Sequence, residues 1–265
     1  MDPLIVHIDG IGIWAPGIPD WGALTRVLEN GESVQSDANA RPSPSALPPT
    51  ERRRAPEPVL IACEAAGQAC AMAARDPSKL ACVFTSTHGD LAITDAMCAT
   101  LAADPRELSP TRFHNSVHNA PAGYWTVAAH CHAAATAISA SLGSFAMGLL
   151  EAAIEVHADN ETVLLSAYDI AARGPLAEVA PSTVPFAVAF VLSSTRGPRS
   201  LARLSLQTVP QPSASNDAPA SLAPLAGNPM AAQSLPLLVA LSRREASNII
   251  IASGTDTFLS VEVTP

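Results

Sequence analysis

Residues 133–156 (AAATAISASLGSFAMGLLEAAIEV) constrain the fold more than any other stretch of the chain. Their first part, 134–140, is small, apolar and uncharged, which predicts a strand of a sheet covered on both faces. From Leu142 onwards, apolar residues recur at spacings of three and four and so share one face of a helix. The stretch therefore predicts a buried strand that turns sharply at 141–143 and enters a helix.

The turn Ser141-Leu142-Gly143 is the kind of elbow at which many enzymes place a nucleophile. The N-terminus of the helix that follows such a turn stabilises developing negative charge. Leu142 occupies the apex in this chain, and a hydrocarbon side chain can neither attack a substrate nor transfer a proton. We therefore expect no nucleophilic catalysis from the apex itself.

The rest of the chain alternates between predicted strands and predicted helices. Strands are expected over 4–8, 81–85, 162–167, 184–192, 201–209, 248–252 and 257–263, and helices over 21–28, 59–75, 91–101, 120–129 and 230–240. Surface or polar loops are expected over 31–56, 109–119 and 210–224. This alternation predicts an α/β protein with a largely parallel sheet.

Composition excludes several classes of function. The 265 residues carry a net charge of −9, and Arg52-Arg53-Arg54 is the main basic run, so nucleic acid is not an expected partner. No uninterrupted apolar run reaches the roughly 18 residues of a membrane span. Five cysteines without a C-x-x-C pair, and no signal peptide, predict a reducing cytoplasm.

An ordered set of motifs resembles the thiolase fold of the β-ketoacyl synthases over roughly residues 4–195. The motifs are DGIG at 9–12, the helix at 59–75, VFTS at 83–86, FHNS at 113–116, AGYWT at 122–126 and the elbow. FHNSVHNAPAGYW and SAYD resemble in particular a small ketosynthase-like group of bacterial aryl polyene (xanthomonadin-type) pathways. The resemblance implies a thiolase-like layered α/β/α fold, with 1–198 as a ketoacyl-synthase-like N-terminal region and 199–265 as a truncated C-terminal half.

The chain departs from the enzymes of this family at three catalytic groups. Those enzymes carry at the elbow a Cys that takes the acyl chain from an acyl carrier protein, where this chain has Leu142. They also carry two histidines in the C-terminal half that support decarboxylation of the malonyl extender. All seven histidines here lie at or before His157. Because condensation through a thioester needs a thiolate and a stabilised enolate, we expect no such reaction from this chain.

In type II polyketide systems an inactive homologue, the chain length factor, pairs with an active ketosynthase. By resemblance, the elbow strand pairs across the two-fold axis of this dimer, and the inactive subunit walls off part of the acyl tunnel. The resemblance implies that role here, with an active ketosynthase as partner, an acyl carrier protein reached through that partner, and no cofactor. Candidate residues that would limit chain growth by bulk are Leu142, Phe145, Leu91, Ile93 and Met97.

Several residues also have plainer interpretations. Leu142 and Phe145 fit a hydrophobic core equally well, His88 fits a hydrogen-bonded turn, and Arg52–Arg54 fit either a solvated loop or a contact with an acidic carrier protein. His114 and His118 lack an evident third ligand, and adjacent residues such as His130-Cys131-His132 do not converge on one ion. We therefore expect no metal site.

Two other functions remain open on the sequence. One is a stand-alone acyltransferase or thioesterase on the same scaffold, using Ser141, Ser144 or Cys131, although no G-x-S-x-G motif is present. The other is a module that binds a carrier protein or acts as a scaffold, with no role in a tunnel.

Overall fold

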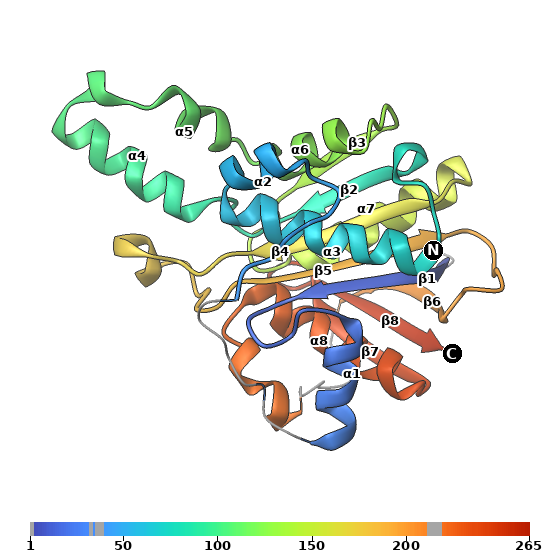
Figure 1. Cartoon of the computed structure of the whole chain (residues 1–265). Helices are drawn as coiled ribbons and strands as arrows, with labels where there is room; N and C mark the ends of the chain where they lie inside the picture. The colour runs from blue at the N-terminus through green and yellow to red at the C-terminus, as the bar shows by residue number, and fades with distance from the viewer. Residues whose placement is uncertain (1–2, 32–33, 35–39, 211–218) are drawn as a thin grey trace.

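One sheet of eight strands, in the order β3-β2-β4-β5-β1-β6-β8-β7, forms the centre of the molecule (Figure 1). The fold is taken from a computed structural model that describes residues 3–31, 34, 40–210 and 219–265. The strands are β1 (Leu4–Trp14), β2 (Ala81–Thr85), β3 (Ala135–Ile138), β4 (Val163–Asp169), β5 (Phe186–Ser193), β6 (Ala202–Val209), β7 (Ser247–Ala252) and β8 (Phe258–Thr264).

Helices cover both faces of this sheet. They are α1 (Trp21–Asn30), α2 (Pro49–Arg54), α3 (Glu57–Ala73), α4 (Leu91–Ala103), α5 (Pro110–Asn115), α6 (Ala120–Ala128), α7 (Ser144–Asp159) and α8 (Pro229–Arg243), with 3-10 turns at Pro77–Lys79, Pro105–Glu107, Gly174–Glu178 and Ala220–Leu225. Along β5, Val188 and Phe190 join a core formed with α7 and α8, whereas Ala189 and Val191 join a second core formed with α3. The predicted α/β/α layering is confirmed.

The sheet is mixed and mostly antiparallel, so the prediction of a largely parallel sheet is wrong. β2 runs parallel to β3 and to β4, as crossover helices require. β4 and β5, β5 and β1, and β1 and β6 are antiparallel. The reason lies in the connections after residue 169. The segments that join β4 to β5 and β5 to β6 contain no α-helix, so each following strand can return in the opposite direction.

β1 continues to Trp14, well past the end predicted at Ile8. A change in register against β5 between Ile8 and Gly10 marks a bulge, after which the strand resumes. A Cβ atom on Gly12 would lie 1.9 Å from the carbonyl oxygen of Ala65 in α3. The absence of a side chain at Gly12 therefore lets α3 pack directly on the strand.

Short helices occupy parts of two predicted loops. α5 lies within the predicted loop 109–119, and α2 lies within the predicted loop 31–56. Both helices begin with proline, which is favoured in the first turn of a helix. Part of the loop 31–56, and residues 211–218 of the loop 210–224, lie outside the described residues.

The prediction that the elbow strand is buried on both faces is wrong. β3 is the last strand at its end of the sheet, and its side chains alternate between exposed and half-buried. A run of small apolar residues looks the same in a covered strand and in an edge strand, because burial depends on what lies beyond the strand. In the described part of this chain, nothing pairs with the outer edge of β3.

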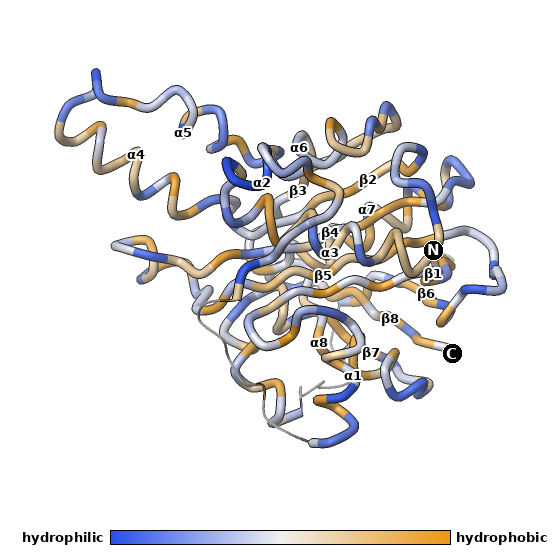
Figure 2. Tube along the Cα trace, viewed as in Figure 1, coloured by the Kyte–Doolittle hydropathy of each residue, from blue (hydrophilic) through white to orange (hydrophobic). Residues whose placement is uncertain are grey.

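Helices α4 and α5 form an arm, residues 91–115, that projects from the body (Figure 1). α4 is predominantly apolar, yet Leu91 at its start is its only buried residue. Figure 2 shows hydrophobic residues along the length of this projecting helix. Among the described helices, none combines the length and apolar character needed to cross a bilayer.

Candidate functional site

The predicted elbow is confirmed at the end of β3. The chain leaves the strand, passes through Ser141 in the left-handed region (φ 52°), and begins α7 at Ser144. Parallel strands β2, β3 and β4 all end at this edge of the sheet, where ligands commonly bind in open α/β sheets. We take the elbow and the segments around it as the candidate functional site.

The Ser144 side chain is bonded to the main chain of the elbow. It is fully buried, and its Oγ accepts from the main-chain N–H of Ala140 at 2.9 Å and donates to the carbonyl of Ser141 at 2.6 Å. The Ser144 carbonyl in turn accepts from Oγ1 of Thr85, at the end of β2, at 2.9 Å. Hydrogen bonds of Ser144 therefore connect the elbow to β2.

Leu142 projects from the apex of the elbow and is 53% exposed. Its carbonyl accepts a hydrogen bond from Nε2 of Gln233 in α8, which also donates to Ala252 at the end of β7. A Cβ atom on Gly143 would lie 2.7 Å from the carbonyl oxygen of Ser253, so glycine is needed where the elbow meets the β7–β8 turn. Helix α8 and the β7–β8 turn thus contact the elbow, and the Leu142 side chain at its apex stays exposed.

Ser141 and Cys131 are the other candidate nucleophiles. Cys131 is buried, and its thiol donates to the carbonyl of Leu80 at 3.2 Å. Among the described hydrogen bonds, none joins Ser141, Ser144 or Cys131 to a histidine or a carboxylate. His118, on the neighbouring segment, instead lies 3.2 Å from the carbonyl of Ser86 through Nε2. Among the described hydrogen bonds, these three side chains therefore form no nucleophile–base pair.

The residues expected to limit chain growth lie in two different surroundings, one at the elbow and one on the arm. Phe145 is fully buried, with its ring centroid 6.4 Å from that of Phe190. On the arm, Leu91 is buried at the base, while Ile93 and Met97 are half-buried. The structure does not bring the arm candidates and Leu142 into one closed pocket within the described residues.

Sequence reasoning missed a buried polar cluster beside the elbow. Oδ1 of Asp169, at the end of β4, accepts from Oγ of Ser86 at 2.7 Å and from N–H of Thr87 at 2.9 Å, and Oδ2 accepts from Oγ1 of Thr87 at 2.6 Å. Burial raises the pKa of Asp169, and these hydrogen bonds oppose that rise. Asn228, also fully buried, caps α8; its position just before Pro229 was the available sequence signal.

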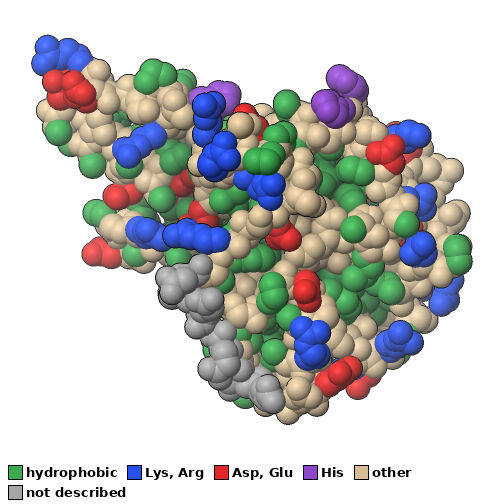
Figure 3. Space-filling model, in the orientation of Figure 1, with side chains coloured by type: hydrophobic (Ala, Val, Ile, Leu, Met, Phe, Trp, Pro, Cys, Tyr) green, Lys and Arg blue, Asp and Glu red, His purple; other side chains and the backbone are tan. Residues whose placement is uncertain are grey.

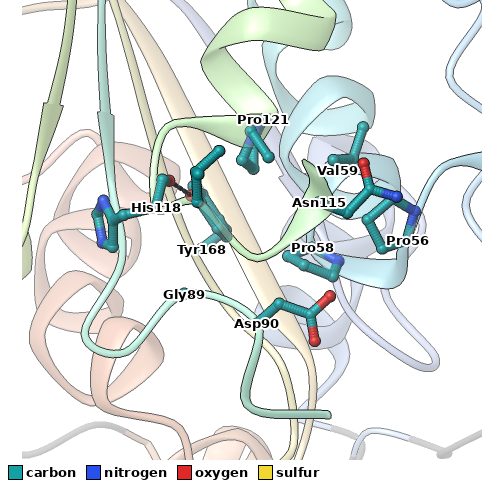
Figure 4. Close-up of a pocket in the computed structure, with 11 residues that line it drawn as sticks. Pro56, Pro58, Val59, Gly89, Asp90, Asn115, His118, Pro121 and Tyr168 are labelled. Atoms are coloured by element: carbon teal, nitrogen blue, oxygen red, sulfur yellow. Dashed lines mark hydrogen bonds between the residues drawn. The ribbon is translucent and has the colours of Figure 1, made fainter. Parts of the chain in front are cut away.

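A small cavity lies where the two ends of the arm meet the body (Figure 4). Asp90, Asn115, His118 and Tyr168 are among its lining residues, and the Tyr168 hydroxyl donates to the carbonyl of His118 at 3.4 Å. Its volume of about 10 Å³ is close to that of a single water molecule. This cavity is therefore too small for any acyl substrate.

A larger, open groove of about 550 Å³ lies between α2 and α6. Exposed Val117 and Val127 lie along it, and His114 and His130 form part of its rim. Figure 3 shows Lys and Arg side chains gathered near α2, whose last turn carries Arg52, Arg53 and Arg54. Within the described residues, no three His, Cys, Asp or Glu side chains come together to hold a metal ion.

The chain matches the family described as β-ketoacyl synthase, N-terminal domain, over residues 28–254, and it belongs to that family. No curated protein is similar enough in sequence to count as a match.

Solved structures of similar fold span nearly the whole chain. A chain from the complex of the ketosynthase ApeO with its chain length factor ApeC, from Xenorhabdus doucetiae, is 26% identical, with a TM-score of 0.72 over 98% of this chain and 99% of that one. A chain of the ishigamide ketosynthase/chain length factor is 13% identical, with a TM-score of 0.72 over 97% and 98%. A chain of AntDE:AntF, a type II polyketide synthase acyl carrier protein with its ketosynthase, is 13% identical, with a TM-score of 0.73 over 100% and 99%. The fold is thus that of the thiolase-like ketosynthases.

Proposed function

We propose that this chain is a non-catalytic chain length factor, which pairs with an active ketosynthase and shapes the acyl tunnel in aryl polyene-type polyketide synthesis. The observation that carries the proposal is the elbow, where Leu142 occupies the apex and the neighbouring Ser144 is committed to internal hydrogen bonds. Such an elbow keeps the shape of a ketosynthase active site and lacks its reaction. The partner would supply the thiolate and the histidines, and would receive the acyl carrier protein.

The open edge of β3 supports a partner subunit. Along a strand, main-chain groups point alternately to either side. The carbonyl of Ala134 accepts from Cys82 in β2, and that of Ile138 accepts from Ser86 just after β2. The N–H and carbonyl groups of Ala135 and Ala137 therefore face away from the sheet. An exposed edge with small side chains is a template for pairing with another strand.

Exposed apolar side chains around this edge also favour a partner. α6, which packs beside β3, exposes Val127 (76%), and the elbow exposes Leu142. The projecting α4 adds further apolar surface, with Leu101 exposed near its end. Apolar surface of this kind marks protein–protein contacts in soluble proteins.

The stand-alone acyltransferase or thioesterase is the weaker alternative, because Ser141, Ser144 and Cys131 have no base among their described hydrogen-bond partners. A carrier-binding scaffold remains compatible with Arg52–Arg54, but does not account for the open β3 edge. All five cysteines are free thiols, which favours the cytoplasm as the place of action.

Co-expression with an intact ketosynthase encoded beside this chain tests the proposal. We expect a 1:1 complex that survives gel filtration, and poor solubility of this chain alone. A monodisperse monomer that fails to associate with that ketosynthase would contradict the proposal.

Shortening the arm candidates should lengthen the product of the reconstituted pair. Met97→Ala and Ile93→Ala remove bulk from half-buried positions on α4, and each truncation opens room for added carbons of the growing chain. Product length, read by mass spectrometry, should shift upwards by at least one extension unit. Leu201→Ala, at an exposed position between β5 and β6, is the control and should leave the products unchanged. Unchanged product length for both arm variants would show that these positions of α4 do not line the tunnel.

A further inference from the structure

The loop between β2 and α4, residues 86–90, connects the sheet to the arm. Its bonds to Asp169 involve both carboxylate oxygens, and Oγ of Ser86 also accepts from the N–H of Gly89 at 2.9 Å. Gly89 itself is in the left-handed region (φ 67°), and Asp90 caps α4 through the N–H of Ile93. The position at which the arm begins is therefore set by the loop's bonds to Asp169.

The main chain of Asp169 is held in place by the sheet and by Asn228. Its main chain lies in the sheet opposite Phe186 of β5, and its carbonyl accepts from Nδ2 of the buried Asn228 at 3.0 Å. Asn228 also donates to the carbonyl of Val184 at 2.7 Å and caps α8. Side-chain and main-chain bonds thus tie Asp169 to separate segments of the fold.

The same loop contacts the elbow. Oγ of Ser139, between β3 and the elbow, donates to the carbonyl of Thr87 at 2.9 Å. The carbonyl of Thr87 thus accepts a hydrogen bond from the elbow segment, and its hydroxyl donates one to Asp169 at 2.6 Å. Among the described side-chain hydrogen bonds, it is the one from Ser139 that joins residues 86–90 to 139–142, and beside it the main-chain N–H of Ser86 donates to the carbonyl of Ile138 at 3.3 Å.

We infer that Asp169 is a positioning residue that couples the arm to the elbow, acting through Thr87 and Ser139. When the Thr87 hydroxyl donates to Oδ2 of Asp169, the start of α4 and the elbow keep a fixed position relative to each other. When the bond is lost, both loosen together. The inference concerns the rigidity of this chain and holds independently of the proposed function.

Amide hydrogen exchange on the full chain, in the state in which it purifies, tests the coupling. Thr87→Val keeps the side-chain shape and leaves Oδ2 of Asp169 without its described donor. Exchange should rise about tenfold at the N–H groups of Gly89 and Ile93 in the loop and of Ala140 and Gly143 in the elbow. In a Ser139→Ala background, Thr87→Val should still raise exchange in the loop but no longer in the elbow.

Ser200→Ala is the matched control, because it removes one hydroxyl from another buried carboxylate, Asp9, to which Ser200 donates at 2.7 Å. It should leave the exchange of loop and elbow unchanged. If Thr87→Val prevents folding, Asp169→Asn, which preserves the shape of the side chain, replaces it in the same comparison. An elbow that does not respond, or a rise spread evenly over all elements, would overturn the inference.

Discussion

Replacing Ala137 with proline should weaken the complex with the ketosynthase and leave this chain folded. The N–H of Ala137 faces away from β2, so its loss costs no hydrogen bond within the sheet, and proline is tolerated on edge strands in that orientation. A partner strand that pairs with β3 would lose this donor and meet the proline ring. We expect the Kd to rise about 100-fold, or about 2.7 kcal/mol, because the interface loses a main-chain hydrogen bond and the ring keeps the partner strand from approaching.

Ala137→Ser is the control for this variant, because it changes the side chain and keeps the N–H. It should bind the ketosynthase as the wild type does. The measurement is a dilution series of each co-expressed, co-purified complex, in which the fraction that stays associated gives the Kd, with circular dichroism of each complex to verify the fold. Equal affinity for wild type and Ala137→Pro would show that β3 takes no part in the interface.

Phe145→Ala should lower the free energy of unfolding by about 3–5 kcal/mol, the usual effect of truncating a buried phenylalanine. Phe145 is fully buried and packs beside Phe190 in the core between the sheet and α7. Chemical denaturation followed by fluorescence of the three tryptophans gives the change directly.

Ile154→Ala on the same helix is the matched control, since Ile154 is 43% exposed and should cost about 1 kcal/mol or less. The pair of variants also separates the two interpretations of Phe145. A Phe145→Ala chain of unchanged stability whose complex makes longer products would place Phe145 in the tunnel and contradict its role in the core.

The positions of most elements could be predicted from the sequence, because local patterns determine them. The strand at 81–85 was predicted to the residue, and the elbow follows from apolar residues whose spacing changes at 141–143. The direction of the strands was mispredicted, because it depends on whether a connection contains a crossover helix. The burial of β3 was mispredicted, because a run of small apolar residues does not reveal whether another element covers the strand.

The candidate site was predictable only in part. A residue type at an apex can be identified along the sequence, so Leu142 and the missing C-terminal histidines could be recognised. Asp169, Thr87 and Ser139 come from three separate segments and meet only when β2, β3 and β4 align in parallel. Serine and threonine are common in loops, so nothing local distinguishes the ones that bind a buried carboxylate.

Acylation of the reconstituted pair tests the central claim most directly. The purified complex is incubated with an acyl thioester of the carrier protein, and each subunit is weighed by intact-protein mass spectrometry. We predict one acyl group on the ketosynthase and none on this chain, whose elbow offers Leu142 in place of a nucleophile. An acyl adduct on Ser141, Ser144 or Cys131, lost when that residue is replaced by alanine, would contradict the account.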